Sequence, residues 1–378
     1  MGYHGHFESQ KPKKKKRGGK VFLIILLILV VLGAAAAIAG VSYYNKMMNK
    51  MNIIELPEDT YVYTEETTLP AETDGMDAEE TVEVTEETTE ETTIPPMTAD
   101  DIINILVVGQ SSRAGEESQM ADTTILVTVN TYTGTVKLSS VLRDSYVKLP
   151  DYRGHTCGRA KFTVCYNLGY QWGGGTPGAM EMTNICMRDN FGVEIDYNIE
   201  IDFESFIRLI DFMGGVEIEL TEAEANYLND EDLYVLYDVQ PGKQWLDGMA
   251  ALAYARMRKA EGDNESDIKR SERQRNLISA LLEKVRYLSI PELQSVADTL
   301  LPLITTTMTP SDIADVLLRV LPLVRDLKIE SGTIPVEGTG WGEVIDIYED
   351  GIPDSVIKFE TAQQKKLIRA FTEAEIAN

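Results

Sequence analysis

A basic segment followed directly by a long apolar run constrains this chain more than any other feature. Residues 11–20 read Lys-Pro-Lys-Lys-Lys-Lys-Arg-Gly-Gly-Lys, and the apolar run extends from Val21 to about Tyr44. A helix that crosses a bilayer needs roughly 20 such residues, and an excess of Lys and Arg marks its cytoplasmic side. We therefore expect a basic cytoplasmic tail over residues 1–20 and a single-pass transmembrane anchor over residues 21–44. The rest of the chain would lie outside the cytoplasm, at the cell membrane.

Two other interpretations of this N-terminal region compete with the anchor. A basic tail by itself is also typical of nuclear or nucleic-acid-binding segments. Its contact with a hydrophobic span favours a topological role, so no nucleic-acid partner is expected. Small residues from Ala34 to Ala39 resemble a signal-peptide cleavage site, but the length of the apolar run favours an anchor that is retained.

Residues 45–100 do not have the composition of a folded domain. The stretch from Glu55 to Pro96 is rich in Glu and Thr and contains almost no large apolar side chains. Such a segment cannot bury enough apolar surface to offset the entropy lost on ordering. We expect an extended, self-repelling linker. Because much of the negative charge lies here, the net charge of −26 says little about the folded part.

Strand and helix patterns alternate from Asp101 onward. Short apolar runs that end at Gly or turn residues predict strands over 102–109, 123–130 and 135–142, the last two close enough to form a hairpin. Further strands are expected over 197–201 and 216–220, and an apolar edge over 356–359. Helices are expected over 177–190, 203–213, 245–254 and 268–288, with two more in 291–327 and one from Thr361. A long loop is expected over 150–177. The alternation predicts one extracytoplasmic domain over 101–378, a three-layer α/β/α fold with a mixed central sheet.

The long helix expected over 268–288 carries charged residues on its apolar stripe. At about 100° per residue, the apolar members of this stripe are Ile278, Leu281 and Val285, and its polar members are Asp267, Arg270 and Gln274. Arg273 and Arg275 fall off the stripe, on opposite flanks. A charge aimed at the core is costly unless it is paired or holds an anion. The sequence therefore predicts a buried anion site within an acidic chain.

Two further arginines precede this helix. Arg256 and Arg258 would point roughly 200° apart on a helix but share a face on an extended segment. The preceding helix is expected to end near Tyr254, so the two side chains can converge on one anion. A charge-assisted hydrogen bond to phosphate contributes about 1.5–3 kcal/mol, and several could hold a pyrophosphate carried on a lipid. The alternative is a solvated basic helix face.

Two strand ends carry the remaining candidate residues. Asp122 stands where a polar loop enters a strand. It is either a turn or cap residue or a ligand for Mg²⁺, because this ion prefers carboxylate oxygens and binds beside phosphate. Arg143 and Asp144 follow the next strand. Arg143 can present a planar fork to phosphate, and Asp144 a carboxylate to a metal or a cation. The alternative is a surface ion pair worth less than about 1 kcal/mol.

The three cysteines, Cys157, Cys165 and Cys186, show no metal-site spacing. Outside the cytoplasm, Cys157 and Cys165 could pair across a short loop and leave one thiol over. The sequence leaves this pairing open.

Taken in order, these residues resemble the LytR-CpsA-Psr family. The ordered set is the strand 104–109, Asp122-Thr123, Arg143-Asp144, Lys161, Arg256-x-Arg258 and Asp267-x-x-Arg270-x-x-Arg273-Gln274, framed by Asp202-Phe203 and Gly214-Gly215-Val216. The resemblance covers roughly residues 101–290. It implies an extracytoplasmic phosphotransferase that moves a teichoic acid or capsule-type glycopolymer from undecaprenyl pyrophosphate to peptidoglycan. It also implies that the lipid tail lies in a hydrophobic tunnel between sheet and helices.

The resemblance assigns roles to individual residues. It implies that Asp122 is a Mg²⁺ ligand and that Arg143 is the catalytic arginine. The residues implied to bind the pyrophosphate are Arg256, Arg258, Arg270, Gln274 and Lys161, and those implied to support them are Asp144, Asp267 and Arg273.

The chain departs from the family pattern at two places. Gly109-Gln110-Ser111 stands where the family has Gly-x-Asp, a second metal ligand, and Met120-Ala121-Asp122-Thr123 stands where it has Arg-Ser-Asp-Thr. Losing one carboxylate weakens Mg²⁺ binding, because one or two carboxylates plus phosphate usually hold this ion. The alternative hypothesis is therefore a non-catalytic, membrane-tethered protein that binds polyprenyl pyrophosphate or acts as a regulator.

Overall fold

The computed structural model describes residues 49–57, 98–110, 119, 121–230, 235, 237–258, 260, 267–286, 301–323, 328–348 and 351–373, with single residues between 292 and 299. The expected tail and anchor, and most of the expected linker, lie outside these ranges. Within the described ranges, no helix is long and apolar enough to cross a membrane.

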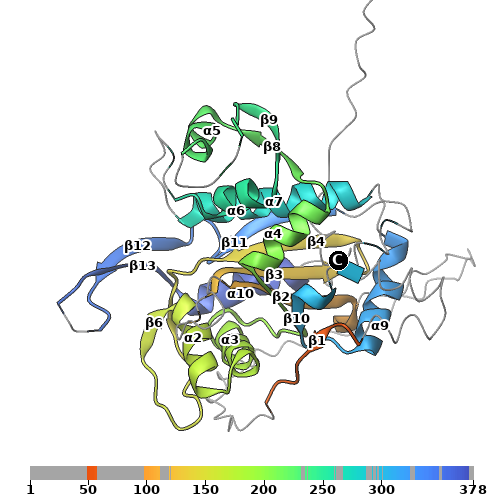
Figure 1. The fold of residues 1–378 in the computed structure, drawn as a ribbon. Helices are drawn as coiled ribbons and strands as arrows, with labels where there is room; N and C mark the ends of the chain where they lie inside the picture. The colour runs from red at the N-terminus through yellow and green to blue at the C-terminus, as the bar shows by residue number, and fades with distance from the viewer. Residues whose placement is uncertain are drawn as a thin grey trace, which may run out of the picture.

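A mixed seven-stranded sheet forms the centre of the domain (Figure 1). Its strands, in spatial order, are β1 (Asn52–Ile53), β10 (Ile304–Thr306), β7 (Tyr197–Asp202), β2 (Ile102–Gln110), β3 (Ala121–Asn130), β4 (Thr135–Val141) and β11 (Lys328–Ile334). Strands β3 and β4 pair antiparallel, as expected for a hairpin, whereas β7 runs parallel to β2 and β11 parallel to β4. The predicted α/β class with a mixed central sheet is confirmed.

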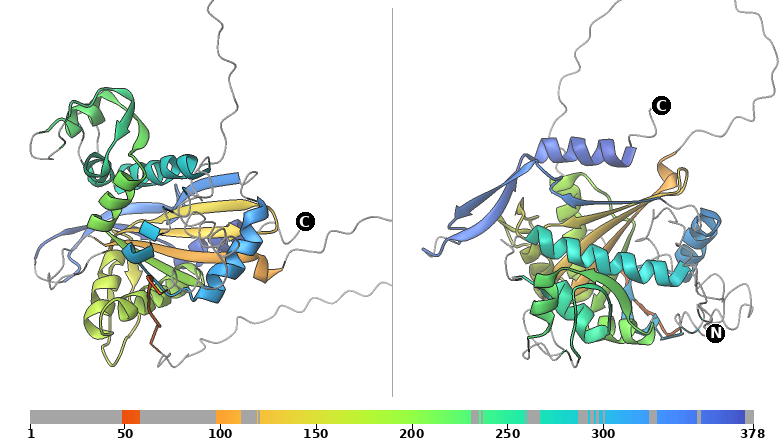
Figure 2. Two further views of the ribbon diagram at one scale, coloured as in Figure 1. Left: turned by 45° about the vertical axis from the view of Figure 1, so that its right-hand side comes forward. Right: turned by 90° about the horizontal axis from the view of Figure 1, so that it is seen from above.

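Helices cover both faces of this sheet (Figures 1 and 2). One face carries α4 (Phe203–Phe212), α6 (Gly248–Arg256) and α7 (Asp267–Arg286), and the other carries α2 (Phe162–Trp172), α3 (Thr176–Phe191) and α10 (Thr361–Glu373). The neighbouring residues Ile105 and Leu106 are both fully buried and belong to opposite hydrophobic cores. Burial on both faces explains why β2 reads as a continuous apolar run.

The remaining elements lie around the central sheet and the helices on its two faces. A hairpin of β8 (Val216–Leu220) and β9 (Gly242–Leu246), with α5 (Glu222–Leu228), rises beyond α6 and α7 (Figure 1). The short elements are β5 (Tyr146–Lys148), β6 (Arg159–Lys161), η1 (Ala99–Asp101), η3 (Leu301–Leu303), α9 (Pro310–Val320) and η4 (Leu321–Leu323). A ribbon of β12 (Gly340–Ile345) and β13 (Asp354–Phe359) extends away from the body.

The prediction of a long loop over 150–177 is wrong, because this stretch contains β6 and α2. Its glycines suggested a loop, but two of them are packing positions within and beside helices. A Cβ atom at Gly169 would lie 2.5 Å from the carbonyl oxygen of Gly178. A Cβ atom at Gly173 would lie 2.4 Å from the Gly178 Cα. Glycine is required here because α2 and α3 approach with their backbones in contact.

Two other boundaries differ from expectation. The helix predicted from Trp245 begins only at Gly248, after Asp247 caps it by accepting a hydrogen bond from the Ala250 amide. Within 291–327, where two helices were expected, the described residues Glu292, Ser295, Asp298 and Thr299 are helical, and strand β10, which was not expected, precedes helix α9. The break between them falls at Thr309-Pro310, as predicted, and β11 and β12 were not predicted.

Candidate functional site

The carboxyl ends of β2, β4, β7 and β11 lie at one edge of the sheet, because these strands run in the same direction. At this edge Gln110 of β2 is flanked by Asp202 of β7 and by Ala121 of β3. The β2–β3 register shifts here, so that Asp122 falls in a β-bulge. Bulges commonly re-aim a side chain beside an active site. The local structure therefore directs the Asp122 carboxylate out of the regular sheet pattern.

A chain of alternating charges starts from Asp122. Its Oδ1 lies 3.3 Å from Arg143 NH1, and Arg143 Nε lies 3.7 Å from Asp144 Oδ2. Lys161 Nζ continues the chain, 3.6 Å from Asp144 Oδ1 and 3.0 Å from Asp354 Oδ1. All five side chains are between 21% and 27% exposed, so solvent and ligands can reach each of them. Asp354 was not predicted as part of the site.

The backbone around Arg143 and Asp144 is held on two sides. The Thr163 amide donates to the Arg143 carbonyl at 3.1 Å, and the Thr163 hydroxyl donates to the Ala121 carbonyl at 3.0 Å. On the other side, the Ile357 amide of β13 donates to the Asp144 carbonyl at 2.8 Å. The start of α2 and the base of β13 thus fix where the Arg143 guanidinium can reach.

Arg256 reaches the same edge from the other face of the sheet. It is the last residue of α6, and its guanidinium lies 4.9 Å from the centre of the Phe203 ring. Phe203 follows Asp202 directly at the carboxyl end of β7. Met257 has an extended conformation and is fully buried, whereas Arg256 and Arg258 are both exposed. The two arginines therefore share a side of the chain, as the extended arrangement predicts.

The N-terminal half of α7 buries more charge than its periodicity predicted. Arg270 is buried, as expected, and Gln274 is half-buried with its Nε2 donating to the Ala255 carbonyl at 3.3 Å. Asp267 is the first residue of α7, and its side chain lies outside the described part. Arg275, on a flank as predicted, donates to the Ser140 hydroxyl of β4 at 2.8 Å, and burial lowers the pKa of its guanidinium.

The prediction that Arg273 lies off the buried stripe is wrong. Arg273 Nε donates to Glu224 Oε1 at 2.8 Å, and Arg273 Nη1 donates to the Met257 carbonyl at 3.2 Å. The buried face of α7 runs through Arg270, Arg273, Leu277 and Leu281. This flank is covered because α5, an element that the sequence analysis did not identify, packs beside it and supplies Glu224.

A buried polar cluster near the end of β7 was not predicted from the sequence. Tyr166 donates its hydroxyl hydrogen to Glu200, and the Thr176 hydroxyl donates to Glu200 Oε1 at 3.5 Å. Burial raises the pKa of the Glu200 carboxyl and also that of Tyr166. The signal that could have revealed it is a carboxylate between Ile199 and Ile201 in an otherwise buried strand.

Replacing Glu200 with glutamine tests this buried carboxyl. Its pKa is raised above the ordinary value of 4.5, so the folded state binds the proton more tightly than the unfolded state. This stabilisation is complete below about pH 4.5 and is lost as the pH rises through the raised pKa. We expect the Glu200→Gln variant to gain stability relative to the wild type as the pH rises. Denaturant unfolding at several pH values measures the difference in free energy of unfolding between variant and wild type. Glu219→Gln, which removes an exposed carboxylate on β8, is the control.

A model of the LytR_cpsA_psr family matches residues 60–366, which is more than half of the chain. The chain belongs to the LytR-CpsA-Psr family. The family assignment agrees with the order of acidic and arginine residues in the sequence and with the mixed α/β fold.

Relatives within the LytR-CpsA-Psr family include two proteins of Bacillus subtilis (strain 168). Polyisoprenyl-teichoic acid–peptidoglycan teichoic acid transferase TagT is 29% identical over 70% of this chain and 74% of its own length. The corresponding transferase TagU is 32% identical, but the match spans 49% of this chain and about half, 52%, of TagU. A solved structure, TagT bound to LIIa-WTA, is similar with a TM-score of 0.55 and 25% identity, over 74% of this chain and 92% of that one.

The donor groups of this LytR-CpsA-Psr protein fit only one kind of metal site. No group of three or more His, Cys, Asp or Glu side chains in the described ranges gathers to hold a metal ion. Mg²⁺ is commonly held by one or two carboxylates together with substrate phosphate. Asp122 can supply the single carboxylate of a site that substrate phosphate completes. Ser111 stands where the family has its other carboxylate, and it lies outside the described residues.

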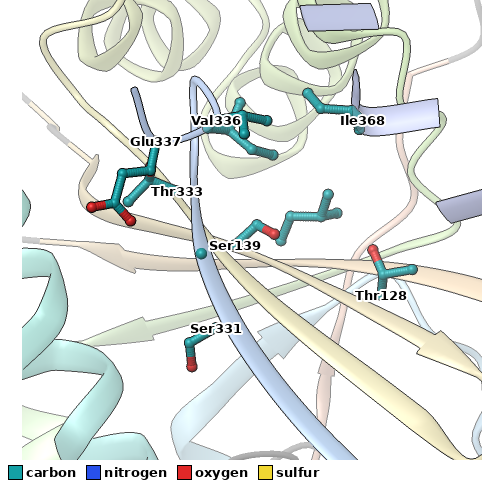
Figure 3. A pocket seen from close by; sticks show the side chains of 10 residues that line it. Thr128, Ser139, Ser331, Thr333, Val336, Glu337 and Ile368 are labelled. Atoms are coloured by element: carbon teal, nitrogen blue, oxygen red, sulfur yellow. The ribbon is translucent and has the colours of Figure 1, made fainter. Parts of the chain in front are cut away.

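A cavity of about 180 Å³ lies on the α10 side of the sheet (Figure 3). Strands β3, β4 and β11 contribute Leu126, Ser139 and Ile334 to its lining, and α10 contributes Ile368. Its lining includes no residue that the sequence predicted for the site. It lies on the face opposite α6 and α7, so it is separate from the arginines of those helices.

All three cysteines are free thiols in this structure. Cys165 and Cys186 are fully buried where α2 packs on α3, and the Cys165 Sγ lies 3.3 Å from the Met182 carbonyl oxygen. Cys157 is only half-buried, in the loop before β6. The pairing of Cys157 with Cys165 that the sequence left open is not formed here.

Proposed function

We propose that this LytR-CpsA-Psr protein is an extracytoplasmic phosphotransferase anchored in the cell membrane by a single span. It would move a teichoic acid or capsule-type glycopolymer from undecaprenyl pyrophosphate to peptidoglycan. The observation that carries the proposal is the Asp122–Arg143 pair at the sheet edge, which Arg256 also reaches. The activity for which the relatives TagT and TagU are named, teichoic acid transfer to peptidoglycan, supports it.

The proposed reaction joins a peptidoglycan hydroxyl to the phosphorus that carries the glycopolymer. One P–O bond forms to the hydroxyl oxygen, and the pyrophosphate P–O bond breaks, releasing undecaprenyl phosphate. Arg143 presents a planar, permanently charged fork that stabilises the charge developing on the leaving phosphate. The Asp122 carboxylate, 3.3 Å from Arg143, holds this fork in place and can accept the hydroxyl proton.

The arginines of α6 and α7 would bind the pyrophosphate before the reaction. Arg256 ends α6 and Arg258 follows the non-helical, buried Met257; both arginines are exposed, and we assign both to one pyrophosphate group. We assign Arg270, Gln274 and Lys161 to the same binding function, with Asp144, Asp267 and Arg273 as supporting residues. Arg273 supports the segment directly, because it donates to the Met257 carbonyl.

Asp122 would also hold Mg²⁺ together with the pyrophosphate oxygens. When bound, this ion neutralises negative charge on the phosphates. The carboxylate has room for this role because it is 27% exposed and its contact to Arg143 uses one of its two oxygens.

Transfer by the full-length chain tests the proposal. The chain is incubated with undecaprenyl-pyrophosphate-linked glycopolymer, peptidoglycan and a range of Mg²⁺ concentrations, and glycopolymer retained covalently on peptidoglycan is measured. We expect Mg²⁺-dependent transfer that Arg143→Ala slows by about 10²- to 10³-fold. Absence of transfer at every Mg²⁺ concentration, with the wild type matching Arg143→Ala, would overturn the enzyme proposal.

The Gly109-Gln110-Ser111 segment motivates the alternative of a binding or regulatory protein. A triple variant, Ser111→Asp with Met120→Arg and Ala121→Ser, restores the family pattern. If the wild type binds polyprenyl pyrophosphate without turnover, and the triple variant turns over, the chain is a binding protein. Equal turnover by both supports the transferase.

A further inference from the structure

The β12–β13 ribbon, which we call the arm, is joined directly to the candidate site. Residue Ile357 of the arm forms a parallel bridge with Ser145 and donates its amide hydrogen to the Asp144 carbonyl. Asp354 of the arm pairs with Lys161 at 3.0 Å. From this base the arm extends beyond the body of the domain (Figures 1 and 2). A molecule lying along the arm would therefore lead into the Asp122–Arg143 pair.

The arm presents an aromatic ring whose polar surroundings are fixed. Trp341 is 45% exposed and lies two residues before Glu343 on β12, so both side chains are on one face of the ribbon. Lys358, the cross-strand neighbour of Trp341, donates to Glu343 Oε1 at 2.7 Å. The same Lys358 Nζ lies 5.7 Å from the centre of the Tyr146 ring. We call Trp341, Glu343, Lys358 and Tyr146 the arm platform; Tyr146 connects it to Ser145 and the site.

The chemistry of the arm platform fits a sugar strand better than a lipid surface. A pyranose ring has apolar C–H faces that pack on an aromatic ring, and hydroxyls that bond to charged groups beside it. Trp341 supplies the ring, and Glu343 and Lys358 supply an acceptor and a donor already held in position. A lipid surface would instead bury these two charges against hydrocarbon, at high cost.

We propose that the arm platform binds a pyranose strand of the peptidoglycan acceptor and aligns its hydroxyl with Asp122 and Arg143. This inference rests on the proposed transferase function. The arm meets the site from the β5 and α2 side, whereas Arg256 meets it from the α4 and α6 side (Figure 1). Acceptor and pyrophosphate would thus approach Arg143 from opposite faces of the sheet.

A binding experiment tests the arm platform without requiring turnover. The full-length chain in detergent micelles is titrated calorimetrically with the tetrasaccharide of N-acetylglucosamine. We expect Trp341→Ala to weaken tetrasaccharide binding by about tenfold, and Trp341→Phe to retain part of the affinity. Trp245→Ala is the matched control, because Trp245 is 58% exposed on β9, away from the arm. Equal affinities of Trp341→Ala and Trp245→Ala would overturn the proposal.

The transfer assay separates this inference from the proposed function. We expect Trp341→Ala to raise the KM for peptidoglycan about tenfold and to leave the KM for the lipid-linked donor unchanged. A rise in the donor KM alone would show that the platform holds the donor polymer, and would overturn the acceptor assignment. If no variant transfers glycopolymer, yet Trp341→Ala alone loses the tetrasaccharide, the transferase proposal fails and the sugar site stands.

Discussion

Replacing Arg143 with alanine is expected to lower kcat/KM for glycopolymer transfer by about 10²- to 10³-fold, the usual effect of removing one donor that stabilises transition-state charge. The Arg143 guanidinium is held in place by its ion pairs with Asp122 and Asp144, and the Arg143 backbone by the hydrogen bond from the Thr163 amide to its carbonyl. Initial rates of transfer to peptidoglycan, measured over a range of donor concentrations, check this result.

Stability measurements show whether the loss of transfer activity in Arg143→Ala arises from unfolding. The Asp122–Arg143 pair is more than a fifth exposed on both sides, so its removal should change the free energy of unfolding by less than about 1 kcal/mol. Arg143→Lys keeps the charge but not the planar fork, and we expect it to fall between alanine and wild type. Arg208→Ala, which removes an exposed arginine on α4, should transfer at the wild-type rate. An Arg143→Ala variant as active as Arg208→Ala would contradict the assigned role.

The second large effect concerns the buried pair between Glu224 and Arg273. We expect Glu224→Gln to destabilise the domain by about 3–5 kcal/mol, because it leaves the Arg273 charge buried without compensation. The two side chains are only 10% and 3% exposed, and their atoms lie 2.8 Å apart. Glutamine keeps an oxygen that can accept the Thr221 amide hydrogen bond, so the helix cap of α5 is retained. Denaturant unfolding of both proteins measures the difference.

An exposed pair of similar length is the control for this measurement. Glu217 and Lys243 lie 3.0 Å apart, but each is 45% exposed, so Glu217→Gln should cost less than about 1 kcal/mol. Adding Arg273→Met to Glu224→Gln removes the buried charge, and the double variant should recover part of the lost stability. Equal losses of unfolding free energy in Glu217→Gln and Glu224→Gln would show that burial does not determine the cost of breaking the Glu224–Arg273 pair.

We expect Glu224→Gln also to weaken ligand binding at the candidate site. Arg273 donates to the Met257 carbonyl, between the two exposed arginines of the segment after α6. If Glu224 no longer holds Arg273, Arg256 and Arg258 lose part of their positioning. We expect weaker binding of polyprenyl pyrophosphate at a temperature where Glu224→Gln is still folded.

Much of the fold was predictable because the signals are local. Apolar runs that end at glycine or turn residues located β2, β3, β4 and β7, and Gly214-Gly215 helped to locate the end of α4. The same reasoning failed over 150–177, where glycines that allow two helices to touch look like loop residues in sequence. Whether a glycine permits a turn or a close contact depends on the neighbour that packs against it, here Gly178 of the next helix.

The sequence alone determined strands β2, β3, β4 and β7, helices α3, α4 and α7, the family pattern of acidic and arginine positions, and the burial of Arg270. These follow from residue type and spacing along one element. Only the tertiary structure decided the partners: Glu224 for Arg273, Asp354 for Lys161 and Phe203 for Arg256. Glu224 is 49 positions from Arg273, and each of the other two pairs likewise joins separate elements. Periodicity gives the direction of a side chain on its own helix or strand, but what it meets depends on how the elements pack.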